Sequence, residues 1–445
     1  MNKILSLFRK ITPFQIITSG FLLVILLGSL LLYLPLSRAG DSPCSYLDAL
    51  FTSTSAVCVT GLVVHNTGTY WSTFGHGVLA VLIQIGGLGV ITVAITFSLL
   101  SGKKIGLRTR DLMQNAIGAP QLGGIIRFTR FLLLFTLLAE SAGAFLLAPG
   151  FIRRYGVGNG IAKSFFHSIS AFCNAGFDTL DKNGTFASLT RYSADLVVNL
   201  VIMLLIIIGG LGFFTWKDLI RNRFRWKNLK MQTRLILTTT ALLILVPAIV
   251  FFFFQFTQGS LKERILMSLF QSVTTRTAGF NTADIGSLKE GSRLIMILLM
   301  LVGGSPGSTA GGIKTTTGAV LLLVLIRNIR RNRNIRVFGR TIPEESIQEA
   351  YTVFFLYLIL FLTGSLVLSA LEEFSMLDCM FECASALGTV GLSTGITASL
   401  GAVSKLILIF FMYFGRVGGL TLAYATLQTT RPNSGKLPEA HVMIG

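Results

Sequence analysis

Four stretches of this chain share one pattern, in which small and polar residues lead to a glycine. They end at Gly61, Gly176, Gly279 and Gly391, at nearly even spacing, and the third is the weakest copy. Glycine permits positive φ, and without a Cβ it leaves the path beside the backbone open. Carbonyl oxygens around such a path can replace the hydration shell of a monovalent cation. The stretches therefore predict a cation-coordinating site built from four loops. Its expected residues are Val57, Cys58, Val59, Thr60, Gly61, Phe172, Cys173, Asn174, Ala175, Gly176, Thr275, Arg276, Thr277, Ala278, Gly279, Leu387, Gly388, Thr389, Val390 and Gly391.

A second glycine-rich stretch, residues 303–318, interrupts an apolar segment that is longer than one membrane thickness. Five glycines and a proline between residues 303 and 312 cannot hold a stable helix. Irregular backbone at membrane depth is tolerated only where it is buried in protein or faces water. We therefore expect a loop inside a broken helix, near the centre of the protein. A phosphate-binding P-loop is excluded, because Ile313 separates Gly312 from Lys314 and no strand precedes the stretch.

The composition indicates a polytopic membrane protein rather than an apolar soluble enzyme. The chain has 445 residues, of which 52% are hydrophobic and 13% charged, with a mean hydropathy of +0.71. Soluble domains carry about 25% charged residues. The net charge of +19 lies in basic clusters at the ends of apolar spans, which is typical of cytoplasmic loops and of contact with membrane lipid. Nucleic-acid binding is therefore not expected. The five cysteines show no metal-site spacing.

The four loops lie within a recurring unit of apolar span, short helix, loop and return span. This predicts an all-α fold with eight transmembrane helices, four re-entrant short helices and both termini in the cytoplasm. The expected repeats are residues 1–110, 111–230, 231–345 and 346–445, the last with a short C-terminal tail. The expected short helices are Cys44–Val57, Ile161–Phe172, Leu261–Thr274 and Met376–Leu387. The expected return spans are Phe74–Leu100, Asp195–Trp216, Leu294–Ile326 and Val403–Leu427.

Each return span contains a pair of glycines. The pairs are Gly86-Gly87, Gly209-Gly210, Gly303-Gly304 and Gly418-Gly419. Paired glycines permit close helix contact in lipid, where small residues drive packing. They are equally compatible with a bend. We favour close packing for the pairs and expect a broken span only in the third repeat.

The loops resemble the four filter loops of the Trk/Ktr/HKT superfamily of cation transporters, most nearly the KtrB-type membrane subunits of bacterial Ktr potassium uptake systems. The resemblance covers essentially the whole chain. It is carried by Thr60-Gly61-Leu62, Asn174-Ala175-Gly176-Phe177, Arg276-Thr277-Ala278-Gly279-Phe280-Asn281 and Gly388-Thr389-Val390-Gly391-Leu392. It implies four repeats around a pseudo-fourfold pore axis, potassium uptake with sodium as a candidate coupled ion, and a bacterial cell membrane. It also implies a homodimer on a cytosolic ring of RCK-type (KtrA-like) subunits. Nucleotide would bind only to that ring, and no covalent cofactor is expected.

The same resemblance implies a gate below the filter. The stretch 303–318 matches the family's intramembrane gating loop, and Arg416 matches a pore arginine. All four loop glycines are present, which in this family is associated with a preference for potassium over sodium. The expected gate residues are Gly303, Gly304, Ser305, Pro306, Gly307, Ser308, Thr309, Ala310, Gly311, Gly312, Lys314 and Arg416.

Charged residues in apolar segments need an explanation, because intramembrane charge is costly. Arg416 would limit cation occupancy of the path, pair with a carboxylate, or bond helix-end carbonyls. Lys314 would plug the closed path or extend toward the cytoplasm. Glu140 is expected to face a protein partner across helices, with ion transport as the weaker alternative. Arg276 is expected to turn away from the path, toward loop carbonyls or an acidic neighbour.

The short helices also carry ionisable residues before their loops, namely Asp48, His167 and Glu382. The two acids would raise the local cation concentration or bond neighbouring loops. The sequence disfavours two other function classes. A secondary transporter of a larger solute would alternate repeat topology, and an enzyme would need a catalytic cluster that four scattered histidines do not supply. A sodium-preferring cation transporter is the remaining alternative.

Overall fold

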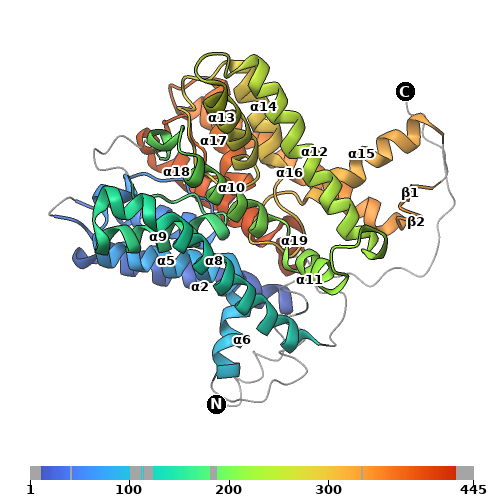
Figure 1. Ribbon diagram of the computed structural model, residues 1–445, viewed down its shortest axis with the longest axis horizontal. Helices are drawn as coiled ribbons and strands as arrows, with labels where there is room; N and C mark the ends of the chain where they lie inside the picture. The colour runs from blue at the N-terminus through green and yellow to red at the C-terminus, as the bar shows by residue number, and fades with distance from the viewer. Residues whose placement is uncertain are drawn as a thin grey trace.

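The computed structural model describes residues 12–40, 43–100, 112, 114, 124–180, 188–331 and 334–426. Within these ranges the protein is almost entirely helical (Figure 1). Two short antiparallel strands, β1 (Arg336–Val337) and β2 (Arg340–Thr341), form a hairpin between α15 (Thr315–Ile329) and α16 (Glu344–Leu371). The expected basic clusters at residues 3–10 and 103–110, and the tail from residue 431, lie outside the described residues.

Four long helices provide most of the apolar length. They are α2 (Pro13–Tyr33), α8 (Ile125–Tyr155), α12 (Met231–Phe254) and α16. Each contains an 18-residue window of mean hydropathy between 2.0 and 2.6, which suffices to cross a bilayer by length and composition. Only 28–33% of each window is buried inside the protein. The outward faces are therefore those of a multi-pass membrane protein.

A short helix packs against each long helix. These helices are α3 (Tyr46–Val57), α9 (Val157–Phe172), α13 (Leu261–Thr274) and α17 (Met376–Gly388), close to the predicted ranges. In the first three, a buried serine hydroxyl donates to a carbonyl of the long helix. The pairs are Ser53 to Ile25 (2.7 Å), Ser168 to Glu140 (2.6 Å) and Ser272 to Ile244 (2.6 Å). The recurring bond shows that α3, α9 and α13 pack against their long helices in the same way.

Every return segment is broken into two helices, so the prediction of a single break was wrong. The pairs are α5 (Thr73–Leu88) with α6 (Val90–Leu100), α10 (Leu196–Gly210) with α11 (Phe213–Arg221), α14 (Glu290–Leu301) with α15, and α18 (Ala402–Val417) with α19 (Gly419–Thr426). The α10–α11 pair is bent by 92°. Gly89, Gly212 and Gly418 stand at three of the breaks with φ of +86°, +87° and +92°, a conformation that glycine adopts without a Cβ penalty.

Other glycines of the same segments serve close packing. A Cβ on Gly86, Gly209 or Gly415 would collide with the carbonyl of Val57, Phe172 or Leu387, respectively. Packing and bending therefore both occur, at glycines three residues apart. In the fourth segment the packing glycine is Gly415. The prediction that Gly418-Gly419 corresponds to the earlier pairs was therefore wrong by three residues.

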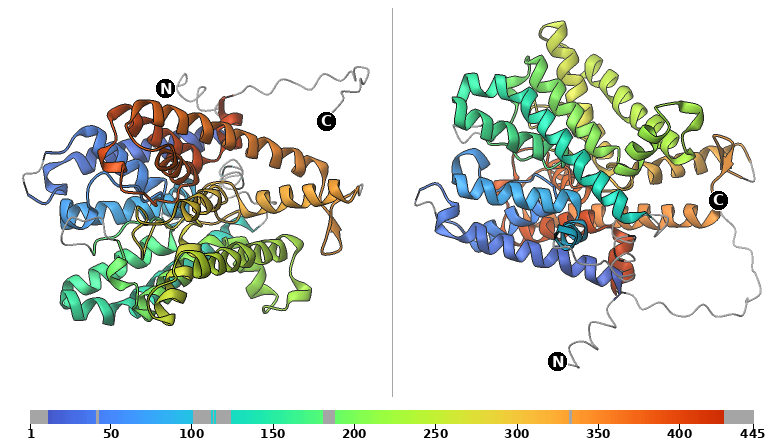
Figure 2. Two further views of the ribbon diagram at one scale, coloured as in Figure 1. Left: turned by 90° about the horizontal axis from the view of Figure 1, so that it is seen from above. Right: turned by 60° about the horizontal axis from the view of Figure 1, so that its bottom comes forward.

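The first and last parts of the chain lie side by side. Helix α18 contacts α3, and α19 contacts α2. Figure 2 shows these blue and red segments adjoining, and the green and yellow segments on the opposite side of the molecule. The segments therefore surround a common centre, where the four loops meet.

Candidate functional site

The four glycine-ended loops form a closed ring. A Cβ placed on each glycine would strike the backbone of the next loop in chain order, and a Cβ on the last glycine would strike the first loop. For Gly176 and Gly279 the contacts would be 2.7 Å and 2.6 Å. The successive contacts are Gly61 with the Ala175 carbonyl, Gly176 with Ala278, Gly279 with Val390, and Gly391 with Thr60. No side chain larger than hydrogen fits at any of these four positions.

Each loop has the same backbone conformation. The four glycines have φ between +70° and +93°, and the residue two positions earlier also has positive φ. Those earlier residues are Val59 (+54°), Asn174 (+60°), Thr277 (+62°) and Thr389 (+51°). Positive φ is uncommon outside glycine, especially for β-branched residues such as valine and threonine. Such strain persists only where the surroundings over-determine it.

A hydroxyl from each short helix holds its loop. Ser55 and Ser385 accept from the amides of Gly61 and Gly391, both at 3.0 Å. Ser170 donates to the carbonyl of Phe177 at 2.8 Å, and Thr274 donates to that of Phe280. Thr274 thus takes over the bonding role of the serine, but it lies five residues before its glycine instead of six, where the third copy has Val273. This offset explains why the third copy is weak in the sequence.

The carbonyls at the start of the loops do not take part in the ring contacts. Those of Val57, Phe172 and Leu387 face the packing glycines of the return helices, and the Phe172 carbonyl also accepts the Thr309 hydroxyl at 3.1 Å. The ring contacts are instead made by the carbonyls directly before the glycines. Cys58 and Cys173 are fully buried.

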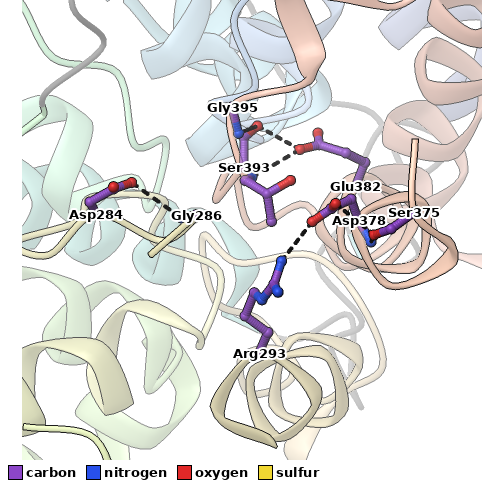
Figure 3. Close-up of polar contacts among 9 residues, drawn as sticks. Asp284, Gly286, Arg293, Ser375, Asp378, Glu382, Ser393 and Gly395 are labelled. Atoms are coloured by element: carbon purple, nitrogen blue, oxygen red, sulfur yellow. Dashed lines mark hydrogen bonds and ion pairs between the residues drawn. The ribbon is translucent and has the colours of Figure 1, made fainter. Parts of the chain in front are cut away.

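All four glycines line a cavity of about 320 Å³ on one side of the ring. Two carboxylates that the sequence reading missed, Asp178 and Asp284, also line it. Asp284 accepts from the amide of Gly286 at 3.2 Å (Figure 3). The available signal was position, since these residues follow Gly176 and Gly279 by two and five places.

The ionisable residues that the sequence analysis named on the short helices do not line this cavity. Asp48 is bonded to Lys405 (2.9 Å) and lies 3.3 Å from His65, so it links the loop after α3 to α18. Burial lowers the pKa of His65, and Asp48 opposes this shift. His167 bonds the Lys163 carbonyl at 2.7 Å and accepts from the amide of Thr179 at 3.3 Å. These side chains hold loops in place.

Glu382 organises the segment that follows the fourth loop. Its buried carboxylate accepts from the hydroxyls of Ser393 (2.5 Å) and Thr397 (2.7 Å) and from the amide of Thr394 (3.2 Å). Figure 3 shows it beside the separate Arg293–Asp378 ion pair, whose atoms are 2.8 Å apart.

We expect Glu382→Ala to lower the free energy of unfolding by roughly 2–4 kcal/mol, because buried donors lose their acceptor. Chemical unfolding of the purified protein in detergent measures the change. Glu373→Ala removes an exposed carboxylate from the preceding turn and serves as the control. Equal stability of the two variants would show that the Glu382 bonds are dispensable.

The glycine-rich stretch forms an irregular loop, residues 302–314, between α14 and α15. Its own ends are tied by the bond from the Gly303 amide to the Ile313 carbonyl, 2.7 Å. The loop is also bonded to two other return segments. Ser305 donates to Gly210 (2.9 Å), and Gly312 donates to Gly415 (3.2 Å). The expected broken-helix loop is therefore present and is held by main-chain bonds.

Arg416 joins this loop to the first return segment. Its guanidinium donates to the carbonyls of Thr309, Gly86 and Gly87, the last at 3.1 Å. Lys314 donates to the Ala310 carbonyl at 2.8 Å. Both side chains line a second cavity of about 320 Å³, whose lining contains no acidic residue among those described. Arg416 therefore bonds helix-end carbonyls and also borders open space.

Two other buried charges have different surroundings. The Cys173 thiol lies 3.8 Å from the Glu140 carboxylate and 3.8 Å from the Gln84 amide oxygen. Glu140 therefore faces protein partners on neighbouring helices, as expected. Arg276 is buried, but its Nε and Nη2 have no hydrogen-bond partner among the described residues. The expected bonds to loop carbonyls or an acid are thus not formed by these two atoms. The described residues contain no His, Cys, Asp and Glu cluster able to hold a metal ion.

Comparison with known proteins identifies the family. Residues 5–431 match the family described as TrkH, cation transport protein. The chain is 40% identical to Ktr system potassium uptake protein B of Bacillus subtilis, over 98% of this chain and 97% of that protein. It is 37% identical to the potassium/sodium uptake protein NtpJ of Enterococcus hirae, over 98% of each.

A solved structure has the same fold. The potassium transporter TrkH of Vibrio parahaemolyticus matches with a TM-score of 0.72 at 23% sequence identity, over 92% of this chain and 85% of that one. The family match and the two curated relatives each span nearly the whole chain. The protein is therefore a member of the TrkH family of cation transport proteins.

Proposed function

We propose that this protein is the membrane translocation subunit of a potassium uptake system and that its ring of four loops selects the ion. The observation that carries the proposal is the closed ring of backbone at the floor of an open cavity. Residues with positive φ flank each ring residue, and its carbonyl lies beside the glycine of the preceding loop. Carbonyls so placed can replace the water around a potassium ion.

The wider arrangement follows from the same proposal. The repeats 1–110, 111–230, 231–345 and 346–445 surround one pore, with the loop 302–314 and Arg416 as its gate. The membrane potential supplies about 2.3 kcal/mol per charge per 100 mV as the driving force. The named relatives are Ktr and potassium uptake proteins. We accordingly place the chain in a bacterial cell membrane with cytoplasmic termini, as a homodimer regulated by a cytosolic nucleotide-binding ring of RCK type.

Sodium is the second candidate ion. The Enterococcus hirae relative is named for potassium and sodium uptake. Growth at limiting potassium of cells that lack their own uptake systems tests the main proposal. Expression of this chain with its cytosolic partner should restore growth, whereas restoration of sodium influx alone would assign the protein to sodium.

The carboxylates of the outer cavity should concentrate cations before the ring. We expect the double variant Asp178→Asn/Asp284→Asn to raise the half-saturating potassium concentration roughly two- to fivefold at low ionic strength. The effect should shrink as salt screens the charges. Rubidium uptake at two ionic strengths measures it. Glu290→Gln removes an exposed carboxylate that does not line this cavity. An equal change in this control would show that the effect is unspecific.

A further inference from the structure

At the junction between α10 and α11, the last carbonyls of α10 bond groups other than the backbone amides of the two helices. In a continuous helix, each of the last α10 carbonyls would accept from the amide four residues later. Here three successive carbonyls have other donors. Ile208 accepts from the Trp216 indole (2.8 Å), Gly209 from the Thr309 amide (3.4 Å), and Gly210 from the Ser305 amide (2.9 Å).

The loop 302–314 also receives a bond from the junction. The Phe213 amide, which would donate to Gly209 in a continuous helix, donates to Gly307 at 2.9 Å. The loop therefore supplies two donors, the amides of Ser305 and Thr309, and one acceptor, the Gly307 carbonyl. These replace bonds that a continuous helix would make within itself. If the loop withdraws, the Phe213 amide and the Gly209 carbonyl can bond each other. Unpaired backbone groups are costly inside a membrane, so this exchange lowers the cost of moving the loop.

The other junctions are held differently. Arg416 bonds Gly86 and Gly87 through its side chain, and Gly415 accepts one bond from Gly312. Among the described residues, only the α10–α11 junction exchanges main-chain bonds with the loop in both directions. This pair is also bent by 92°.

We propose that the α10–α11 junction is a second moving part of the gate, which straightens into a continuous helix when the loop 302–314 withdraws. The inference rests on the proposed function for its link to ion flow. The geometry of the exchange does not depend on which ion passes. Straightening would swing α11 away from its present position and carry the basic segment after it.

Gly212 is the residue that lets the junction be tested. Its φ of +87° disfavours any other residue, and a Cβ there would lie 2.6 Å from the Pro306 carbonyl. Alanine is instead the best residue for a continuous helix. Gly212→Ala should therefore weaken the bent, loop-bound state and favour the straight one. Gly156→Ala is the matched control, because Gly156 has φ of +81° at the α8–α9 junction with no atom within 4 Å of its Cβ position.

The distance between α10 and α11 reports the bend directly. Spin labels at the exposed positions Leu204 and Ile220 would be about 24 Å apart along a continuous helix and about 17 Å apart across a right angle, measured between Cα atoms. We expect the longer distance in Gly212→Ala and in a variant whose loop is shortened between Gly307 and Gly311. Wild type and Gly156→Ala should keep the shorter distance.

Flux gives the second readout. In proteoliposomes without a regulatory partner, Gly212→Ala should raise potassium influx several-fold over wild type, and Gly156→Ala should not. If Gly212→Ala fails to fold, Trp216→Phe, which removes only the indole bond to Ile208, should shift both readouts in the same direction.

Two failures can be separated. A short label distance in both the glycine and the loop variants would overturn the inference, even if wild type transports potassium. A fully activated wild type without potassium influx would overturn the proposed function, while the label distances would still decide whether the junction straightens.

Discussion

Replacing Gly391 with serine is expected to lower the preference for potassium over sodium by at least about tenfold, equivalent to about 1.4 kcal/mol. Gly391 has φ of +90°, and a Cβ there would meet the Thr60 carbonyl and lie 2.8 Å from the Cα of Gly61. The serine would push the fourth loop away from the first. The carbonyls would then no longer match the size of a dehydrated potassium ion.

Rubidium and sodium influx, measured side by side, give the preference. Gly395→Ser is the matched control, because Gly395 also has strongly positive φ (+104°) and lines the cavity but has no atom within 4 Å of its Cβ position. It tests backbone strain without the collision. An unchanged preference in Gly391→Ser would contradict the assignment of the ring as the selective element.

Replacing Arg416 with alanine is expected to raise potassium influx several-fold in the absence of activation. Its guanidinium holds the Thr309 carbonyl of the loop 302–314 to Gly86 and Gly87 of the first return segment. The variant removes those bonds and a positive charge that lines the second cavity. Arg416→Lys should be intermediate, because an ammonium keeps the charge but does not present the planar fork of a guanidinium.

Influx into proteoliposomes measures this effect, and size-exclusion chromatography checks that the variant is folded. Arg293→Ala is the control, since it removes another partly buried arginine, one that pairs with Asp378 away from the loop. A folded Arg416→Ala protein with wild-type influx would show that these bonds do not restrain the gate.

The ring loops and short helices could be predicted because their determinants are local. A glycine required by positive φ and a hydroxyl on the preceding turn recur in each copy, whatever the rest of the fold does. The broken return segments were harder to predict, because paired glycines suit packing and bending equally. The deciding signal was a third glycine, at Gly89 and Gly212, three residues after the first of the pair.

Residues whose role depends on distant partners could not be placed from the sequence. Asp178 and Asp284 line the cavity beside the ring, and their positions shortly after Gly176 and Gly279 do not by themselves show this. Asp48 could not be assigned because its partner Lys405 is 357 positions away. Arg276 is a different case, because it was expected to bond loop carbonyls or an acid, yet its Nε and Nη2 have no hydrogen-bond partner among the described residues.

The order of contacts around the ring has a consequence for biosynthesis. Each loop completes its contact with the following one, and the last contact joins Gly391 to Thr60 in the first loop. A nascent chain inserted as far as α15 has three loops but an incomplete ring. Its first and third loops then lack the backbone that later covers them. The closed ring of this membrane protein therefore forms only when its fourth loop has been synthesised and meets the first.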